Sequence, residues 1–364
     1  MNRREFLRYS AFCSLSVSLA GFVPSTNTFS ESPDDKGLLK GLQIIDAHAH
    51  PDRYVRDSRQ IDNTSTLKAI KKLGMVASCF AAVGDSLFLS QGRQPGTEHG
   101  GTKTQLEYWI KGPIRRGDLN LVLKPSDIPE AVDEKTPPGA ILTIEGGDAL
   151  EGKPDRVDEF YHFGVRMITL VHYRNNELGD IMRVFGNLNP GPSHNGLTEA
   201  GRRVVERMQQ LGMVVDVAHA HTTTLKQVAE ISSKPLVDSH TSPCAIDDPL
   251  RCGRFRTWND MEMVAKTGGV ICTWPMAYKR STVTRITFSD WAKEILEMKK
   301  RLGMEHMGFG TDGGGSLPGL IEGYRDICDL VKLVKAMQEV GFSRDEISAY
   351  MGGNFYRVLR TYIG

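Results

Sequence analysis

Short apolar segments alternate with amphipathic stretches along most of the chain, beginning near Leu42. This alternation is typical of repeated βα units, in which parallel strands are connected by helices. Eight strands are predicted, at residues 44–48, 75–83, 140–145, 166–171, 213–218, 236–239, 269–273 and 307–310. The pattern therefore indicates an α/β fold with a parallel sheet.

The stretches between the strands carry apolar residues at helical spacing. The clearest predicted helices are 66–73, 198–211, 222–231, 259–267, 289–302 and 324–340. Glycines follow several of the predicted helix ends, where a residue with positive φ is favoured: Gly74, Gly212, Gly268, Gly303 and Gly341. Eight such units predict a (β/α)8 barrel of the TIM type, with loop insertions.

Three segments depart from the simple alternation. Residues 90–117 and 173–195 are rich in Gly, Asn and Pro, and they are predicted to be long loops or loop–helix insertions at the barrel mouth. Residues 344–362 carry apolar side chains at helical spacing after the last unit, and they predict an extra C-terminal helix packed on the barrel.

The N-terminus has a different character. Arg3 and Arg4 precede Phe6 and Leu7, and an apolar stretch rich in Ser and Ala follows. This resembles a twin-arginine export signal, with Ala20 as a candidate cleavage point. We predict a signal peptide at 1–23, a linker at 24–41 and the barrel domain at 42–364. The protein is then expected to be periplasmic or otherwise exported, with the twin-arginine machinery as its transport partner.

Charge and composition narrow the class of partner. The chain has 45 Lys and Arg against 44 Asp and Glu, a net charge of +1. Nucleic acid is not an expected partner, because its binding needs a clustered basic excess. No apolar run of about 18 residues follows the signal, so no membrane span is expected in the mature chain. A small-molecule substrate is expected, and a homodimer stays open.

The cysteines do not form a disulfide scaffold. There are six, and Cys13 lies in the predicted signal; the other five show no CxxC pair. One bridge could form in an oxidising compartment, but the sequence does not name its partners.

Polar residues gather where the predicted strands end. Six of the eight strands end in His, Glu or Asp, and a TIM barrel builds its active site at these C-terminal ends. His48 and His50 are separated by one residue, which places both on the same face of an extended strand. Glu145, His219 and His240 end three other strands.

Neutral imidazoles and carboxylates suit zinc and related divalent ions. His48 and His50 are predicted to hold one ion and His219 and His240 a second, with Glu145 bridging the two. This is the layout of a two-metal hydrolase, with ions about 3.5–4 Å apart. Two Zn²⁺ ions are the expected cofactors, and another divalent metal is the alternative.

Motifs along nearly the whole predicted barrel resemble those of the membrane dipeptidase (renal dipeptidase) family of zinc metallopeptidases. The matching segments are Ile45-Asp46-Ala47-His48, Ile144-Glu145-Gly146-Gly147, Leu170-Val171-His172, Gly196-Leu197-Thr198 with Gly201, Asp216-Val217-Ala218-His219, Ser239-His240-Thr241-Ser242, Gly308-Phe309-Gly310-Thr311-Asp312 and Gly352-Gly353-Asn354-Phe355. They occur in the family's order, which makes the resemblance specific.

The resemblance implies roles for individual residues. His48 would bind the first ion, His219 and His240 the second, and Glu145 would bridge them. Three further roles follow from the same resemblance: Asp312 is the expected acid/base residue, His172 contacts the substrate and stabilises the oxyanion, and Arg256 binds the substrate carboxylate. An Arg suits that last task because its planar guanidinium binds a carboxylate in a bidentate way. Arg254 is the competing candidate.

Two departures from the family pattern bear on the site. The family typically has Asp where this chain has His50, and the exchange removes a negative charge from the cluster. The spacing from His240 to Arg256 also looks longer than usual, so metal choice and substrate specificity stay open.

The resemblance implies hydrolysis of dipeptides, including those with a C-terminal D-residue, and the two-metal layout predicts a metal-activated water as the nucleophile. One alternative is an N-acyl-D-amino-acid amidohydrolase on the same fold. Another is a binding protein that lost catalysis through His50. Turnover of free dipeptides would indicate the dipeptidase, and turnover of N-acylated substrates the amidohydrolase. Ligand binding without turnover would indicate the binding protein.

Overall fold

The computed structural model describes residues 37–51, 65–86, 97–182, 191–244, 252–279, 284–315, 317 and 319–363. The predicted signal peptide and most of the predicted linker lie outside these residues, so both stay predictions. Among the helices of the described part, none combines the length and apolarity that a membrane crossing would need.

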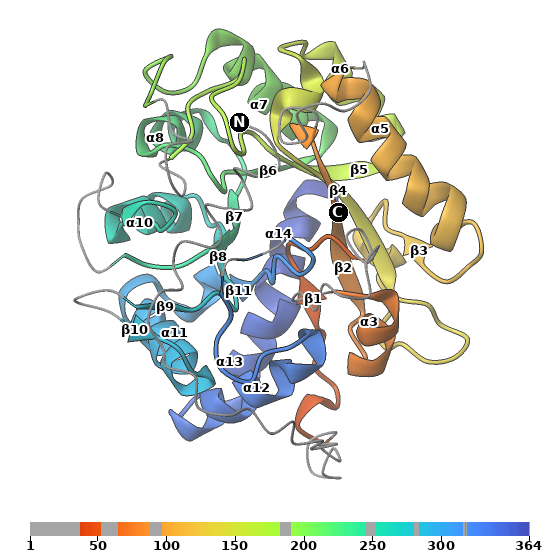
Figure 1. The fold of residues 1–364 in the computed structure, drawn as a ribbon, viewed down its shortest axis with the longest axis vertical. Coiled ribbons are helices and arrows are strands. Elements are labelled where there is room, and N and C mark those ends of the chain that lie inside the picture. The colour runs from red at the N-terminus through yellow and green to blue at the C-terminus, as the bar shows by residue number, and fades with distance from the viewer. Residues whose placement is uncertain are drawn as a thin grey trace, which may run out of the picture.

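Eight parallel strands form a barrel in the order of the chain, as predicted (Figure 1). They are β1 (Ile45–Asp46), β2 (Ala77–Val83), β4 (Gly139–Glu145), β5 (Val165–Thr169), β6 (Val214–Asp216), β7 (Val237–Thr241), β8 (Val270–Thr273) and β11 (Met307–Phe309). The last strand returns to the first, because the Ala47 amide donates to the Phe309 carbonyl over 3.2 Å and Ala49 pairs with Gly313. The (β/α)8 prediction is confirmed.

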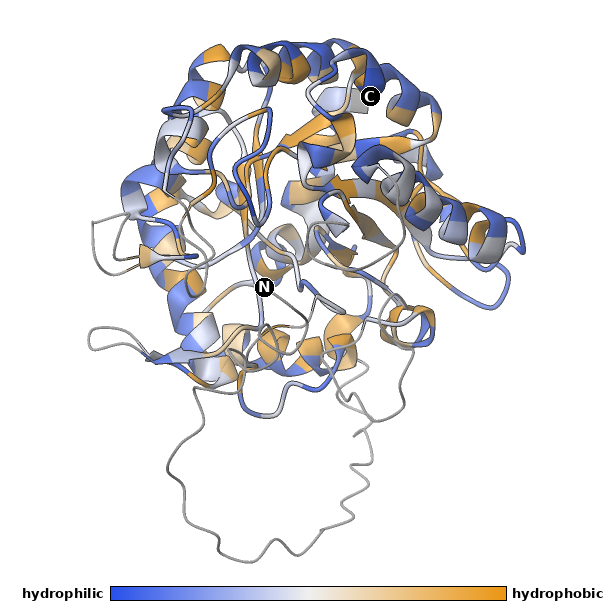
Figure 2. Cartoon of the chain, turned by 45° about the horizontal axis from the view of Figure 1, so that its top comes forward, coloured by the Kyte–Doolittle hydropathy of each residue, from blue (hydrophilic) through white to orange (hydrophobic). Residues whose placement is uncertain are grey.

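Helices surround the strands on the outside (Figure 1). They are α3 (Leu67–Leu73), α5 (Glu98–Trp109), α6 (Asp155–His162), α7 (Glu199–Leu211), α8 (Thr222–Ile231), α10 (Trp258–Lys266), α11 (Phe288–Leu302) and α12 (Leu330–Glu339). Several begin at a threonine whose hydroxyl accepts a hydrogen bond from an amide of the first turn, for example Thr66, Thr198 and Thr287. Hydrophilic and hydrophobic residues alternate along these outer helices (Figure 2), as expected for helices with one buried face.

The segment predicted as a mouth insertion at 90–117 contains a regular barrel helix. Its described part holds α5 and a π-helical turn at Ile110–Ile114, and α5 follows β2 in the usual βα alternation. The helix packs inward through Leu106 and Trp109, whose ring lies 5.6 Å from that of Phe80. The sequence signal was weak because Gly100 and Gly101 in the first turn are poor helix formers.

Short elements fill the connections. They are strand β3 (Asn120–Leu121) beside β4, the antiparallel pair β9 (Tyr278–Lys279) and β10 (Thr284–Arg285), and 3-10 turns at Pro125–Asp127, Gly147–Leu150, Met304–His306 and Ile327–Asp329. The turn at Ile327–Asp329 replaces the beginning of the predicted helix 324–340, so α12 starts at Leu330. Of the predicted loop 173–195, residues 183–190 lie outside the described residues.

The predicted C-terminal helix is present in three parts: α13 (Arg344–Ser348), a π-helical turn (Ala349–Gly353) and α14 (Asn354–Ile363). Phe355, Val358 and Leu359 of α14 join a cluster with the buried residues at the beginnings of the strands, such as Ile141 and Val214. Helix α14 thus closes the N-terminal end of the barrel. Gly352 permits this packing, because a Cβ there would lie 2.2 Å from the Gln43 carbonyl oxygen.

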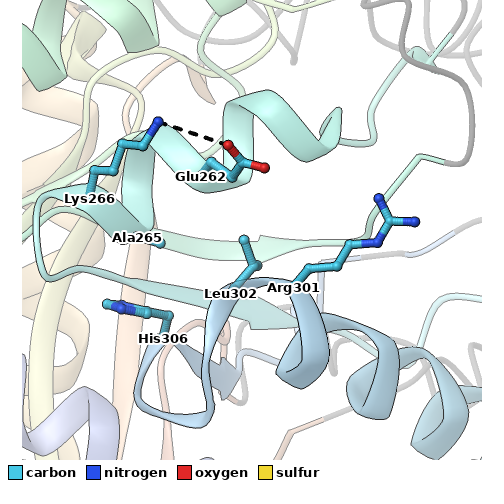
Figure 3. Close-up of a pocket in the computed structure, with 6 residues that line it drawn as sticks. All are labelled: Glu262, Ala265, Lys266, Arg301, Leu302 and His306. Carbon is cyan, nitrogen blue, oxygen red and sulfur yellow. Dashed lines mark ion pairs between the residues drawn. The ribbon is translucent and has the colours of Figure 1, made fainter.

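A surface pocket also lies at this N-terminal end (Figure 3). It is lined by Glu262, Ala265, Lys266, Arg301, Leu302 and His306. These residues stand where α10 and α11 end and where β8 and β11 begin. The pocket is therefore at the opposite end of the strands from the predicted metal ligands.

A disulfide joins Cys244 to Cys252, a pairing that the sequence did not name. Cys79 and Cys272 are buried thiols, and Cys328 is half-buried. Cys244 comes shortly after β7 and Cys252 shortly before Arg254, so the disulfide joins the end of this strand to the segment that carries Arg254.

Candidate metal centre

Glu145 lies at the centre of five histidines gathered at the C-terminal ends of the strands. The Nε2 atoms of His48, His219 and His240 lie 3.3, 3.2 and 3.4 Å from its Oε1. The Nε2 atoms of His50 and His172 lie 3.4 and 3.3 Å from its Oε2. The structure therefore brings together all five predicted metal-ligating residues, with His172 as an additional neighbour.

The cluster forms because five different strands place their ends at one mouth of the barrel. Glu145 ends β4, His172 follows β5, His219 follows β6, and His240 lies in β7. All of these side chains are buried, and so are His48 and His50 after β1. Burying this many titratable groups is costly unless they bind each other or a metal ion.

The donor atoms fit a divalent cation. His48 Nε2 is fully buried and makes no hydrogen bond within the part of the chain that the structure describes. The Nε2 atoms of His219 and His240 lie 3.0 Å apart, and with both rings in the Nδ1–H form their two lone pairs would converge on a single cation. Two groups have the geometry to hold an ion: His48, His50 and Glu145 form one, and Glu145, His172 and His219 form the other.

The second group differs from the predicted one in its third member. The sequence paired His219 with His240, and the geometry adds His172. His240 Nε2 nevertheless lies 3.4 Å from Glu145 Oε1, the same oxygen that His219 contacts. His219 and His240 therefore both line the space next to this oxygen. Its ring also stacks on that of His48, with centroids 4.0 Å apart.

His50 is oriented for coordination despite replacing the family's usual Asp. Its Nδ1 lies 2.8 Å from the Ala81 carbonyl oxygen, which can only accept a hydrogen bond. The ring proton is therefore on Nδ1, and in the neutral ring Nε2 keeps its lone pair toward Glu145 and Asp312. This is the usual arrangement of a metal-binding histidine with a backbone partner.

The charges of the cluster match those required for metal binding. Burial lowers the pKa of His219 and His240 well below the usual value, and the nearby positive charge of Arg254 acts in the same direction on both rings. Burial alone would raise the pKa of Glu145, but the neighbouring charge of His172 holds it well below its usual range. Neutral imidazoles and an ionised carboxylate are the forms that coordinate metal ions.

Asp312 lies at the same mouth, after β11. Its Oδ1 is 3.5 Å from His50 Nε2 and 3.8 Å from His48 Nε2. Its backbone adopts a φ of 50°, and that of His219 a φ of 65°, conformations that non-glycine residues rarely adopt and that concentrate at functional sites. Gly315 lies against this side chain: a Cβ there would lie 1.9 Å from Asp312 Oδ1, so a larger residue would displace the carboxylate.

Two residues at the site were not singled out from the sequence. Asp85, just after β2, is fully buried; its Oδ1 lies 2.8 Å from His172 Nδ1 and its Oδ2 accepts a hydrogen bond from the Tyr173 amide. Burial alone would lower the pKa of His172, but the carboxylates of Asp85 and Glu145 raise it. Tyr173 packs its ring 4.1 Å from that of His172. Their positions were the available signal: Asp85 comes two residues after the end of β2, and Tyr173 directly follows the strand-end His172.

The two candidate arginines have different surroundings. Arg256 is fully buried, its Nε donates to Asp238 over 2.7 Å, and its two terminal nitrogens donate to the carbonyls of Ala220 and Val217. The structure therefore does not place this guanidinium in the metal cluster. Arg254 lies beside the cluster instead, with Nη2 donating to the His240 carbonyl over 2.9 Å.

Fold and donor set together define a barrel protein with a candidate metal-binding centre at the strand ends. Residues 34–362 match the model of the membrane dipeptidase family, peptidase family M19. The chain belongs to this family.

Relatives and solved structures agree with this membership. Dipeptidase tcpJ of Claviceps purpurea is 26% identical over 221 residues, which cover 61% of this chain and 50% of the relative. Dipeptidase 3 of Mus musculus is 28% identical over 224 residues, which cover 60% of this chain and 44% of the relative. The chain thus matches about half the length of these curated relatives.

Two solved structures share the fold over most of their length. The probable dipeptidase PvdM from Pseudomonas aeruginosa superposes with a TM-score of 0.77 at 19% sequence identity. The aligned region covers 90% of this chain and 97% of the PvdM chain. The second is a metallo peptidase from Rhodobacter sphaeroides, liganded with a phosphinate mimic of the dipeptide L-Ala-D-Ala. It has a TM-score of 0.72 at 20% sequence identity, and the aligned region covers 88% of this chain and 99% of the Rhodobacter sphaeroides chain.

Proposed function

We propose that this protein is a metal-dependent dipeptidase. The observation that carries the proposal is the convergence of five imidazoles on the Glu145 carboxylate at the catalytic end of a barrel that belongs to the membrane dipeptidase family. The dipeptide mimic bound by the Rhodobacter sphaeroides structure supports a dipeptide as the class of substrate.

We propose two Zn²⁺ ions as cofactors. His48 and His50 would hold one ion, His219 and His240 the other, and the two oxygens of Glu145 would serve both sides. When bound, divalent ions of this kind supply Lewis acidity, which activates water and polarises a carbonyl group. The nitrogen-rich donor set favours zinc over magnesium or calcium, which prefer oxygen ligands.

The remaining residues would bind the substrate and move protons. Asp312, at the mouth beside His50, would transfer a proton to the departing amine. His172, held by Asp85, would hydrogen-bond the carbonyl oxygen as negative charge develops on it. We assign the substrate carboxylate to Arg254, because Arg256 is already bonded through all three guanidinium nitrogens.

The first experiment measures metal content and hydrolysis on the same sample. L-L and L-D dipeptides and N-acetyl-D-amino acids are offered before and after addition of zinc. About two ions per chain with turnover of free dipeptides is the expected result. Turnover confined to the N-acetyl compounds would replace the dipeptidase with an amidohydrolase. One ion or none, with no turnover of any compound, would overturn the proposal.

The assignment of Arg254 has its own test. Arg254→Met should raise the KM for dipeptides by about tenfold or more, because a charged hydrogen bond is worth about 1.5–3 kcal/mol, and kcat should fall less. Arg254→Lys should recover part of the loss, since it keeps the charge without the planar fork. An unchanged KM in Arg254→Met would rule out this role.

We also propose that the protein is exported through the twin-arginine pathway. The sequence of residues 1–23 supports this, and so does the Cys244–Cys252 disulfide, since such bonds persist in oxidising compartments. Replacing Arg3 and Arg4 together with Lys should leave the precursor in the cytoplasm of a bacterial host. Unchanged export of that variant would contradict the proposal.

A further inference from the structure

A hydrogen-bonded chain of buried side chains lies directly beneath the histidine cluster, inside the barrel. It consists of Thr169, Asp216 and Ser239, from the neighbouring strands β5, β6 and β7. All three are buried, and none has been given a role above. The chain ends at the ring of His240, where Ser239 Oγ lies 2.9 Å from Nδ1.

The Asp216 carboxylate is surrounded by donors. Its Oδ1 accepts hydrogen bonds from the amides of Ala218 and Ser239, each over 3.0 Å. Its Oδ2 accepts from the hydroxyls of Thr169 over 2.5 Å and Ser239 over 2.7 Å. Burial raises the pKa of Asp216, and the bonds from Ser239 and Thr169 oppose that rise. Four donors occupy the four acceptor positions of a carboxylate, so Asp216 acts as the fixed acceptor of this chain.

The Ser239 hydroxyl has one proton, and it donates this proton to Asp216 Oδ2. Since it is donated to Asp216, the oxygen can only accept from the histidines. It lies 2.9 Å from His240 Nδ1 and 3.5 Å from His48 Nδ1, and its two lone pairs can serve both rings. The stacking of these two rings, with 26° between their planes, turns both Nδ1 atoms toward the same hydroxyl.

We propose that Ser239, anchored by Asp216, is a positioning residue that fixes the tautomer of His240 and, more weakly, of His48. Each ring then carries its proton on Nδ1 and directs the lone pair of Nε2 toward Glu145, where a cation binds. The inference rests on the proposed metal site but not on the identity of the substrate. One hydroxyl thus prepares a ligand from each of the two predicted ion positions.

The direct test is the tautomeric state in the metal-free protein. Nitrogen-15 NMR of histidine-labelled protein distinguishes Nδ1–H from Nε2–H rings. Wild type is expected to show His240 as the Nδ1–H form, with its signals assigned by comparison with His240→Gln. An Nε2–H ring at His240 in the wild-type protein would overturn the proposal, whatever any variant does.

The second test measures metal affinity with matched variants. Ser239→Ala should weaken zinc binding by about 10- to 100-fold, the usual cost of losing a partner of a metal-binding histidine. Ser239→Thr, which keeps the hydroxyl, should restore most of the affinity. Thr143→Val is the control, because Thr143 is an equally buried barrel hydroxyl without a hydrogen-bond partner in the described chain.

The outcomes separate this inference from the proposed activity. Zinc affinity that falls in Ser239→Ala and recovers in Ser239→Thr supports the positioning role even if no peptide is hydrolysed. Equal affinity in wild type and Ser239→Ala, with both proteins folded, would overturn it even if dipeptides are hydrolysed.

Discussion

At the scale of single residues, the centre depends on one carboxylate. Both oxygens of Glu145 are shared among five imidazoles, and no other carboxylate in the described chain has this arrangement. Asp312 reaches only the His48 and His50 side of the cluster. The charge of Glu145 is therefore the main negative contribution to any cation bound between the histidines.

Replacing Glu145 with Gln should remove this charge while keeping the shape of the side chain. We expect zinc affinity to fall by more than about tenfold, as for other losses of an anionic ligand or its support. Isothermal titration of the metal-free protein measures the change. Glu206→Gln, at an exposed position on α7, is the control and should bind as wild type. Equal affinities would show that the carboxylate does not contribute.

Arg256 should prove to be a stability residue. Its removal in Arg256→Met leaves Asp238 buried without its partner, and such a loss costs about 3–5 kcal/mol. Chemical denaturation of the metal-free protein measures this cost. Adding Asp238→Asn to the same protein should recover a large part of it, since the unpaired charge is then gone. A small effect of Arg256→Met on unfolding, with a large one on KM, would return the substrate role to Arg256.

At the scale of elements, the rim of the barrel is held by connections outside the βα repeat. The Cys244–Cys252 disulfide and the hydrogen bonds between Ser242, Cys244 and Arg256 fix the segment after β7 to the segment before α10. Arg254 lies within this linked pair of segments, over the Trp274 ring at 4.9 Å. The position of the proposed carboxylate-binding residue therefore depends on the disulfide.

Removing the disulfide with Cys244→Ser and Cys252→Ser together should destabilise the fold. Closing so short a loop is worth about 2.5 kcal/mol in the chain-entropy estimate. Thermal and denaturant unfolding should both show a lower midpoint, and thiol reduction of wild type should reproduce it. Cys328→Ser, which removes a free thiol, serves as the control. If unfolding is unchanged, the loop is held by its other contacts alone.

Helix α14 should affect stability without affecting the metal centre. Phe355 is buried in the cluster at the N-terminal end of the barrel, away from the histidines. Phe355→Ala should cost about 3–5 kcal/mol of unfolding free energy. Metal content per folded chain should stay as in wild type. A loss of bound metal from the folded variant would show that the two ends of the barrel are coupled.

At the scale of the whole molecule, the barrel holds several neutral histidines inside a folded protein. His219 and His240 have pKa values well below the usual one because they are buried, whereas both titrate near 6.5 when the chain unfolds. Unfolding at acidic pH therefore takes up protons. The stability contributed by these neutral rings is present above about pH 6.5 and is lost as the pH falls toward their folded pKa values.

The metal-free protein should accordingly lose stability between about pH 7.5 and 5.5. Denaturant unfolding at a series of pH values measures the slope. His240→Asn should show a shallower slope in this range, because it removes one of the titrating rings. Equal slopes in wild type and His240→Asn would contradict the neutral assignment, whereas His172, whose pKa is raised, contributes in the opposite sense to both proteins.

The amino-acid sequence alone was enough to predict the barrel, its strands and the end at which its site lies. Apolar segments of strand length alternating with capped helices left one architecture, and His48, Glu145 and His240 stood where its strands end. Helix α5 was predicted only as part of a loop or loop–helix insertion, because Gly100 and Gly101 in its first turn are poor helix formers. These features are local, so periodicity and turn chemistry could show them.

The contacts between those residues could be found only in the folded protein. The pairing of Cys244 with Cys252, the contact of Asp85 with His172, and the different surroundings of Arg254 and Arg256 depend on atoms brought together from distant segments. The inclusion of His172 among the candidate ligands has the same origin. Spacing along the chain places a side chain on a strand, but its hydrogen-bond partners are set by the packing of neighbouring strands and loops.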